Sequence, residues 1–158
     1  MKKLCGLFLV FSMVLSLTGC VALLPFSSSN KLEDFYEKMC ETQNLLDDVA
    51  DTIYENWYDA IYNDEFGDDI NVAIAAAQVT HQADLERIEA LDTEIADLFK
   101  DLKDDKSYGE TVKKVMSAYS DYYELVVNVS GSYKSYSEKK ETLKKDFASA
   151  LKELSYEL

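Results

Sequence analysis

Residues 69–104 read DINVAIAAAQVTHQADLERIEALDTEIADLFKDLKD, and the spacing of apolar side chains in this stretch decides the fold class. A sustained seven-residue repeat of apolar positions is typical of a helix that buries one continuous face. The repeat, in which His81 and Asp84 are the polar members, consists of Ile74, His81, Ile88, Ile95 and Leu102, with Ala77, Asp84, Leu91 and Leu98 between them. The pattern predicts one long helix over 69–104 with a seam like that of a coiled coil.

Three other segments also repeat their apolar residues with a helical period. The first covers residues 31–63, where Asn30 and Glu33 resemble a capping box; the second opens at Ser107 with Glu110 and stops at Gly131; the third opens at Ser135 with Glu138 and passes Leu154. Between the first two helices, residues 63–69 predict a turn in which Gly67 takes a left-handed conformation and an aspartate caps the next helix. No alternating strand pattern occurs.

Four amphipathic helices with short connections predict an all-α fold, an up-and-down antiparallel four-helix bundle. At a rise of about 1.5 Å per residue, the first hairpin, 31–104, has helices of about 50 Å, and the second, 107–154, has helices of about 33 Å. Because of this difference in length, the end of the long hairpin, residues 54–78, is expected to project past the short one. We call residues 54–78 the distal end.

The first residues show the pattern of an export signal. Lys2 and Lys3 precede an apolar segment over residues 4–16, and small residues follow it. This segment ends in Leu17-Thr18-Gly19-Cys20, which resembles the lipobox of bacterial lipoproteins, where cleavage precedes a cysteine linked to diacylglycerol.

That resemblance implies residues 1–19 as a signal peptide, residues 20–30 as a lipidated Cys20 with a spacer, and residues 31–158 as one helical domain. It also implies attachment to the cell membrane, on the extracytoplasmic side of the envelope, through acyl chains such as palmitate on Cys20. Two alternatives stay open: an uncleaved membrane span that ends before Pro25, and cleavage without lipid.

Charge and cysteine content narrow the classes of partner. The chain carries a net charge of −14, and removal of the signal with its two lysines makes this −16. Such a surface repels phosphate backbones, so we expect no nucleic-acid partner, and any partner held by charge should be cationic. Cys40 then has no intramolecular partner, which leaves a packing residue or a link between two chains.

The distal end is the candidate partner-binding site. It carries five aromatic residues, opposite a run of alanines over 73–77: Tyr54, Trp57, Tyr58, Tyr62 and Phe66. Tyrosine and tryptophan are enriched where binding energy concentrates. The alternative is that the rings fill the space left by the alanines and form core. The excess of acid over residues 31–105 has two readings as well, a surface for a basic protein or divalent cations and a solvated face that keeps the domain soluble.

The sequence contains no clear catalytic or metal-binding motif. His81 and Asp84 could orient an imidazole, but no nucleophile shares their seam, which favours a polar layer that fixes helix register. Neither EF-hand nor di-iron spacing is present, and we expect no metal, cofactor or catalytic residues. A non-enzymatic binding module of the envelope is the first hypothesis. The others are a structural or accessory envelope lipoprotein, for example a phage-borne exclusion protein, and a small-molecule carrier or enzyme.

Overall fold

The structure, a computed structural model, describes residues 28–158 and is helical. Within these residues it contains α1 (Ser28–Tyr62), the 3-10 helix η1 (Glu65–Asp68), α2 (Ile70–Thr80), α3 (Gln82–Leu102), α4 (Gly109–Val127) and α5 (Tyr133–Leu154), and no strand. The all-α class is therefore confirmed, with five α-helices in place of the four expected. The lipobox and the apolar segment before it lie outside the described residues.

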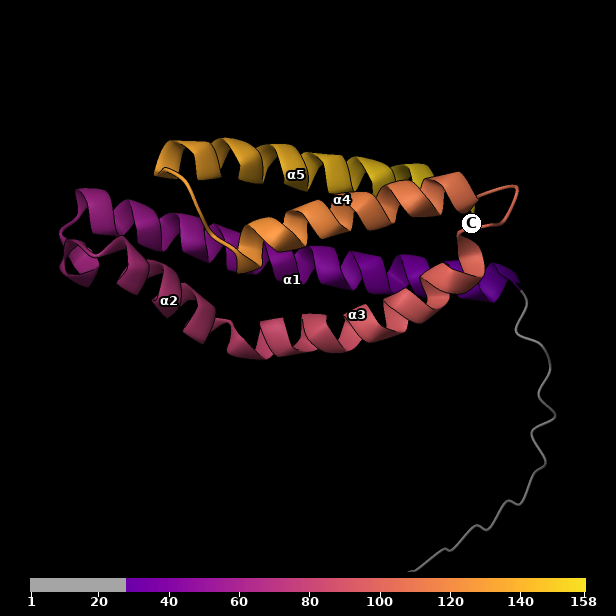
Figure 1. Ribbon diagram of the computed structural model, residues 1–158, viewed down its shortest axis with the longest axis horizontal. Coiled ribbons are helices and arrows are strands. Elements are labelled where there is room, and N and C mark those ends of the chain that lie inside the picture. Colours follow the sequence, from indigo (N-terminus) through magenta and orange to yellow (C-terminus); the bar gives the residue numbers. More distant parts are fainter. Residues whose placement is uncertain (1–27) are drawn as a thin grey trace, which may run out of the picture.

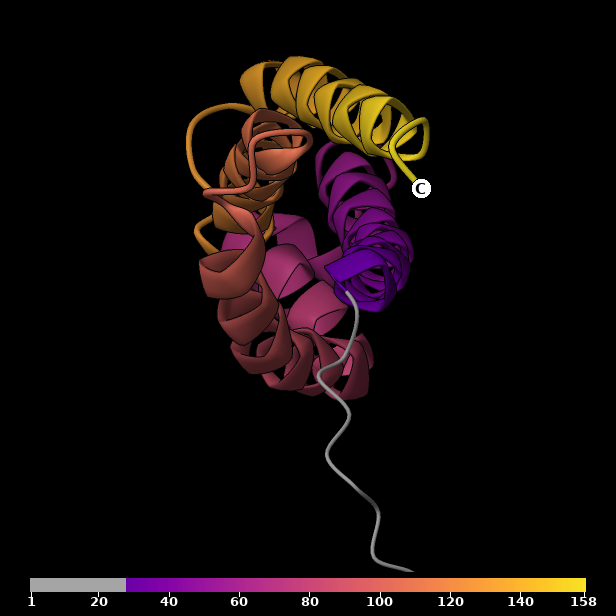
Figure 2. The ribbon, with the colours of Figure 1, turned by 90° about the vertical axis from the view of Figure 1, so that its right-hand side faces the viewer.

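The long helix α1 is the element on which the others assemble. It packs against α2, α3, α4 and α5, with α4 and α5 on one side and α2 and α3 on the other (Figures 1 and 2). The helices α4 and α5 also pack extensively against each other. None of the helices in this part of the chain is both long and apolar enough to cross a membrane.

Ion pairs across the surface give the register of α1 against α3. Lys31 lies 2.6 Å from Asp101, and Arg87 lies 2.7 Å from Glu41. The partner numbers on α3 fall as those on α1 rise, so the two helices are antiparallel. Each pair is exposed and contributes at most about 1 kcal/mol, so the pairs report the register more than they stabilise it.

The stretch 69–104 is two helices instead of the one expected, and the break lies at His81. His81 has non-helical angles of φ −104 and ψ 26, and beside it the Thr80 hydroxyl donates to the Ala76 carbonyl at 2.9 Å. The bend at this point makes α2 and α3 bow along one side of α1 (Figure 1). The inward face is continuous across it, since Ala77, Ile88 and Ile95 are all buried.

The helix starts are only partly as expected. Asp69 caps α2 by accepting from the amide of Asn71, and Gly67 is left-handed at φ 63, as predicted. The three capping boxes were predicted wrongly: α1 already begins at Ser28, α4 begins at Gly109 without a side-chain cap, and α5 begins two residues before Ser135. The box at α5 is instead formed by Ser132 and Ser135.

The predicted inward faces form the core. The fully buried large side chains come from α1, α3, α4 and α5. The largest of them are Tyr122, Tyr136, Phe35, Phe147, Met39, Leu46, Ile53, Ile88, Leu91, Ile95, Leu102 and Leu154. In the segment 31–63, whose apolar residues have a helical period, Ile61 is 41% exposed. Beyond this core, the last turns of α1 with η1 and the start of α2 extend past the ends of α4 and α5 (Figure 1).

Candidate functional site

Aromatic side chains gather where α5 begins beside the last turns of α1. Tyr54 stacks on Tyr133 with ring centroids 5.1 Å apart, Trp57 lies 5.5 Å from Tyr136, and Tyr58 lies 4.7 Å from Tyr62. Tyr133 is the centre of the group, because its ring also contacts those of Trp57, Tyr58 and Tyr62. We call the six residues the aromatic cluster: Tyr54, Trp57, Tyr58, Tyr62, Tyr133 and Tyr136.

Burial divides the cluster into a base and a surface. Trp57 is only 3% exposed and Tyr136 is fully buried, whereas Tyr58 is 44% and Tyr62 is 60% exposed. Tyr136 also donates from its hydroxyl to the Ala50 carbonyl at 3.4 Å. The two interpretations of the sequence therefore apply to different rings: Trp57 is core, while Tyr58 and Tyr62 present surface that a partner could contact.

The alanines of α2 pack against α1. Ala73 and Ala77 are buried, Ala77 belongs to the same core as Trp57, and the Asn56 side-chain amide donates to the Ala73 carbonyl at 3.1 Å. Small side chains there allow the two backbones to come close enough for this bond. The ring-to-ring contacts of the cluster come from α5, because Tyr133 and Tyr136 supply them.

Phe66 is separate from the cluster. It lies in η1 with a left-handed φ of 56, is half-buried, and makes no ring contact within residues 28–158. Four of the five aromatic residues predicted as a site are thus brought together, and Phe66 is not.

A lysine on α5 completes the cluster and could not be assigned to it from the sequence alone. Lys140 is 6% exposed, pairs with Asp51, and places its Nζ 4.6 Å from the centroid of the Tyr54 ring. Next to it, Lys144 lies 3.2 Å from Asp47, which accepts a hydrogen bond from Tyr122 at 2.7 Å. The signal in the sequence is the spacing of Tyr133, Tyr136 and Lys140, which places them on one face of a helix that starts before Ser135.

The indole N–H of Trp57 is buried without a hydrogen-bond partner. Such a group raises the free energy of the folded state by about 1–3 kcal/mol. Tyrosine side chains are protonated at neutral pH, because their ordinary pKa is about 10. Burial is the main cause that raises the pKa values of Tyr133 and Tyr136 further. The base of the cluster is therefore uncharged.

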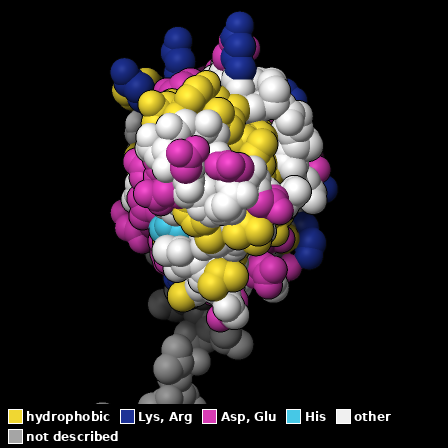
Figure 3. All heavy atoms as spheres, turned by 90° about the vertical axis from the view of Figure 1, so that its left-hand side faces the viewer, with side chains coloured by type: hydrophobic (Ala, Val, Ile, Leu, Met, Phe, Trp, Pro, Cys, Tyr) yellow, Lys and Arg dark blue, Asp and Glu magenta, His cyan; other side chains and the backbone are white. Residues whose placement is uncertain are grey.

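The acids beside the exposed rings form no ion pair in the part of the chain that the structure describes. Residues 39–86 contain no lysine or arginine, and within residues 28–158 neither Glu55 nor Asp59 takes part in an ion pair. Viewed from the distal end, apolar and acidic side chains share the face, and the lysines stand at its edge (Figure 3). The electrostatic potential of this end is negative.

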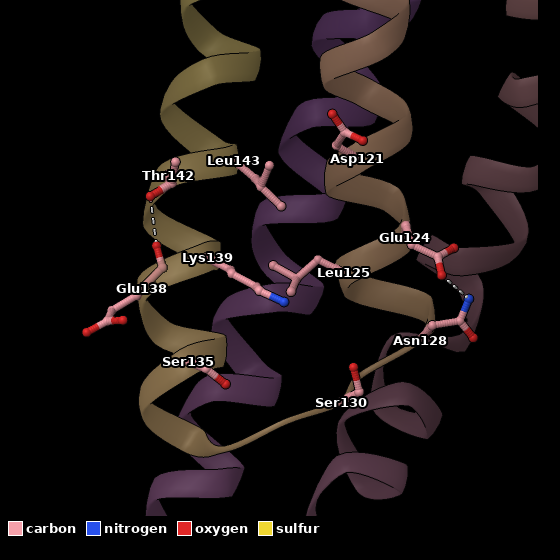
Figure 4. A pocket seen from close by; sticks show the side chains of 10 residues that line it. All are labelled: Asp121, Glu124, Leu125, Asn128, Ser130, Ser135, Glu138, Lys139, Thr142 and Leu143. Carbon is pink, nitrogen blue, oxygen red and sulfur yellow. Dashed lines mark hydrogen bonds between the residues drawn. The ribbon is translucent and has the colours of Figure 1, made fainter.

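Two hollows lie near the cluster. The smaller, about 410 Å³, is lined by Tyr54, Glu55, Tyr58 and Asp59 of α1. The larger, about 530 Å³, is an open groove between α4 and α5 with Leu125 and Leu143 at its floor and Lys139 pointing across it (Figure 4). Its polar side chains are spread over about two turns of each helix and the loop between them, and they do not converge on one point.

The contacts of His81 and Cys40 fit a role in packing more than a role in catalysis. The His81 ring lies 2.8 Å from the Thr52 hydroxyl and 2.6 Å from an Asp84 carboxylate oxygen, so both ring nitrogens have partners and the three side chains link α1 to the start of α3. Cys40 is half-buried and free, and burial raises the pKa of its thiol. A raised thiol pKa disfavours the reactive thiolate.

The part of the chain that the structure describes contains no group of three or more His, Cys, Asp or Glu side chains arranged to hold a metal ion. The aromatic cluster, where the last turns of α1 meet the start of α5, is the best-defined candidate site. Comparison of the chain with protein-family models, with curated proteins and with solved structures finds no match.

Proposed function

We propose that this chain is a lipid-anchored, extracytoplasmic binding module of the cell envelope, without enzymatic activity, and that the aromatic cluster at the distal end holds a protein partner. The observation that carries the proposal is the pair of exposed rings, Tyr58 and Tyr62, which pack on the partly buried Tyr133 above the buried Trp57 and Tyr136. Aromatic rings that are already ordered lose little conformational entropy when a partner covers them.

The proposed anchor gives this surface its position. Cys20 precedes α1 by a short spacer, and α1 has 35 residues, which at about 1.5 Å each place its far end about 50 Å from its start. In this proposal the domain is an up-and-down bundle in which α2 and α3 together form one antiparallel arm. The lipid then holds one end at the membrane, and the cluster faces away from it.

The anchor is tested by the mass of the protein extracted from its membrane. We expect a chain that begins at Cys20 and carries acyl groups, and we expect the Cys20→Ser variant to lose them and to leave the membrane fraction. A Cys20→Ser variant that stays in the membrane would contradict the lipid anchor and favour the uncleaved span.

Binding is tested by photocrosslinking in the native membrane. A photoreactive residue at Tyr58 should give a product of defined mass, whereas the same residue at Lys145, which is exposed on α5, should give none. Absence of a product from Tyr58 would overturn the binding proposal and favour a structural or accessory role in the envelope.

A further inference from the structure

The small hollow on α1 has an unusual lining for a surface pocket. Tyr54 and Tyr58 are one turn apart, and so are Glu55 and Asp59. A row of two rings and a neighbouring row of two carboxylates therefore line a hollow of about 410 Å³. Aromatic faces and carboxylates share one preference, which is for a cation. The pocket combines both kinds of group.

Three acids of α1, namely Glu41, Asp47 and Asp51, pair with basic side chains of other helices. Arg87 reaches Glu41 from α3, and Lys140 and Lys144 reach Asp51 from α5. Glu55 and Asp59 are the next acids along the helix, and no lysine or arginine in residues 28–158 pairs with either of them. Asp59 accepts a hydrogen bond from the Asn63 side chain at 2.6 Å, which leaves its negative charge in place. Glu33, Glu37 and Asp48 are in no ion pair within residues 28–158, but they do not line a pocket with aromatic rings.

The cluster also shows how a cation is held here. The Lys140 ammonium lies 4.6 Å from the centroid of the Tyr54 ring. The Tyr54 ring also stacks on Tyr133, so both of these contacts of the ring come from within the chain. The Tyr58 ring stands one turn further on, is 44% exposed, and lines the same pocket as Glu55 and Asp59. It offers a cation from outside the same combination of ring and carboxylate that Lys140 finds inside.

We infer that the pocket formed by Tyr54, Glu55, Tyr58 and Asp59 binds a basic side chain, preferably arginine, from a basic segment of the partner protein. A guanidinium group is planar, so it can lie on the Tyr58 ring and donate to a carboxylate at the same time. This inference rests on the proposed function, because it names the chemistry of the partner at the proposed binding surface.

The test is a titration of the full chain in uncharged detergent with a tetra-arginine peptide and, as a control, a tetra-glutamine peptide. Calorimetry measures the affinity, and Trp57, the single tryptophan of the chain, reports by fluorescence whether the peptide lies at the cluster. We expect tetra-arginine to bind and to change the Trp57 emission, and tetra-glutamine to do neither.

Two double variants of equal charge separate the pocket from the general negative charge. Glu55→Gln with Asp59→Asn should weaken tetra-arginine binding by about tenfold or more, because both carboxylates of the pocket are lost. Asp48→Asn with Glu89→Gln removes two exposed acids elsewhere and should weaken it less than about twofold, because distant charges are screened. Tyr58→Ala provides a second variant that leaves the charge unchanged, and it should also weaken binding.

Three results would overturn the inference: no binding of tetra-arginine, equal weakening by the two double variants, or full affinity in Tyr58→Ala. Circular dichroism of each variant confirms that it is folded. If Tyr58 crosslinks to a partner in the membrane while tetra-arginine fails to bind, the inference is wrong and the proposed function stands. If tetra-arginine binds at the pocket but no crosslink forms in the membrane, the proposed function fails and the cation site remains.

Discussion

Trp57 and Tyr58 are neighbours in the chain with different surroundings. The Trp57 ring lies against Tyr133 and Tyr136 in the core, although its N–H has no partner, whereas almost half of Tyr58 is exposed to solvent. The unsatisfied N–H of a buried indole lowers the stability of the fold, and tyrosine side chains that stay exposed contribute little to the free energy of folding. The two residues can therefore be separated by mutation.

Replacement of both exposed rings, Tyr58→Ser with Tyr62→Ser, should lower the free energy of unfolding by less than about 2 kcal/mol, since surface substitutions usually have small effects. Trp57→Ala should lower it by about 3–5 kcal/mol because it opens a cavity in the core. Urea unfolding followed by circular dichroism measures both. Equal losses would show that all the rings are core and that no site exists there.

Buried tyrosines predict how stability responds to alkaline pH. Burial, followed by the hydrogen bond to Asp47, raises the pKa of Tyr122, and burial is the first cause that raises the pKa of Tyr119 beside Asp92. In the unfolded chain a tyrosine has a pKa of about 10, so above that pH the unfolded state releases protons that the folded state keeps.

The stabilising effect of these phenols is therefore complete below about pH 10 and is lost as the pH rises, by about 1.4 kcal/mol per pH unit for each tyrosine. Tyr122→Phe should reduce this slope by the contribution of one group. Urea unfolding between about pH 8 and about pH 11 measures the slope. A variant with an unchanged slope would contradict the burial of the Tyr122 hydroxyl in the folded state.

At the scale of elements, α2 differs from the helices around it. It buries only Ala73 and Ala77, whereas α3 buries Ile88, Leu91, Ile95 and Leu102. Within residues 28–158, α2 contacts α1, α3 and the short η1 that precedes it, but not α4 or α5. Apolar burial is the main source of helix stability in proteins, so α2 should be the helix that opens most easily.

Hydrogen exchange tests this expectation. Backbone amides of residues 74–80 in α2 should exchange at least about tenfold faster than those of residues 88–102 in α3, which corresponds to about 1.4 kcal/mol less protection. Mass spectrometry of peptides from the two segments gives the comparison. Equal protection would show that α2 and α3 open together as one helix across His81.

The sequence predicted the buried faces better than the ends of the helices. A seven-residue repeat depends only on which side chains are apolar, and that is why Ile88, Ile95 and Leu102 were placed correctly. The break at His81 is a local change of backbone angles, and periodicity cannot show it, because buried residues continue the same inward face on both sides of the break. The same hydroxyl-to-carbonyl bond that Thr80 makes also occurs at Thr142, where α5 is unbroken.

The candidate site was predicted in part for a similar reason. Its α1 residues follow from the aromatic pattern, but Tyr133 lay outside the helix predicted from Ser135, so its place at the centre of the cluster was missed. The role of Lys140 depends on the side-by-side packing of α1 and α5, which only the folded chain determines.

At the scale of the whole molecule, charge is distributed unevenly along the bundle. The net charge is −14, and the acids at the distal end lack basic partners in the described part of the chain. Mutual repulsion of this kind destabilises a compact state, and salt screens it. The cross-helix ion pairs are exposed and contribute little that salt could remove.

Salt should therefore stabilise the domain. We expect Tm to rise when ionic strength is increased from about 0.01 M to about 1 M, over which the screening length falls from about 30 Å to about 3 Å. Thermal unfolding followed by circular dichroism measures the shift. A fall in Tm would mean that the ion pairs of α1 with α3 and α5 outweigh the repulsion.

We propose that a partner protein is held at the exposed rings of the distal end. The most direct test keeps a photoreactive residue at Tyr62, next to Tyr58, and compares the crosslinked product in the native membrane between two variants. Tyr58→Ser should abolish the product, while Tyr156→Ser, which removes an exposed tyrosine at the other end of α5, should leave its yield unchanged. An undiminished product in Tyr58→Ser, or no product from Tyr62 in any variant, would contradict the account.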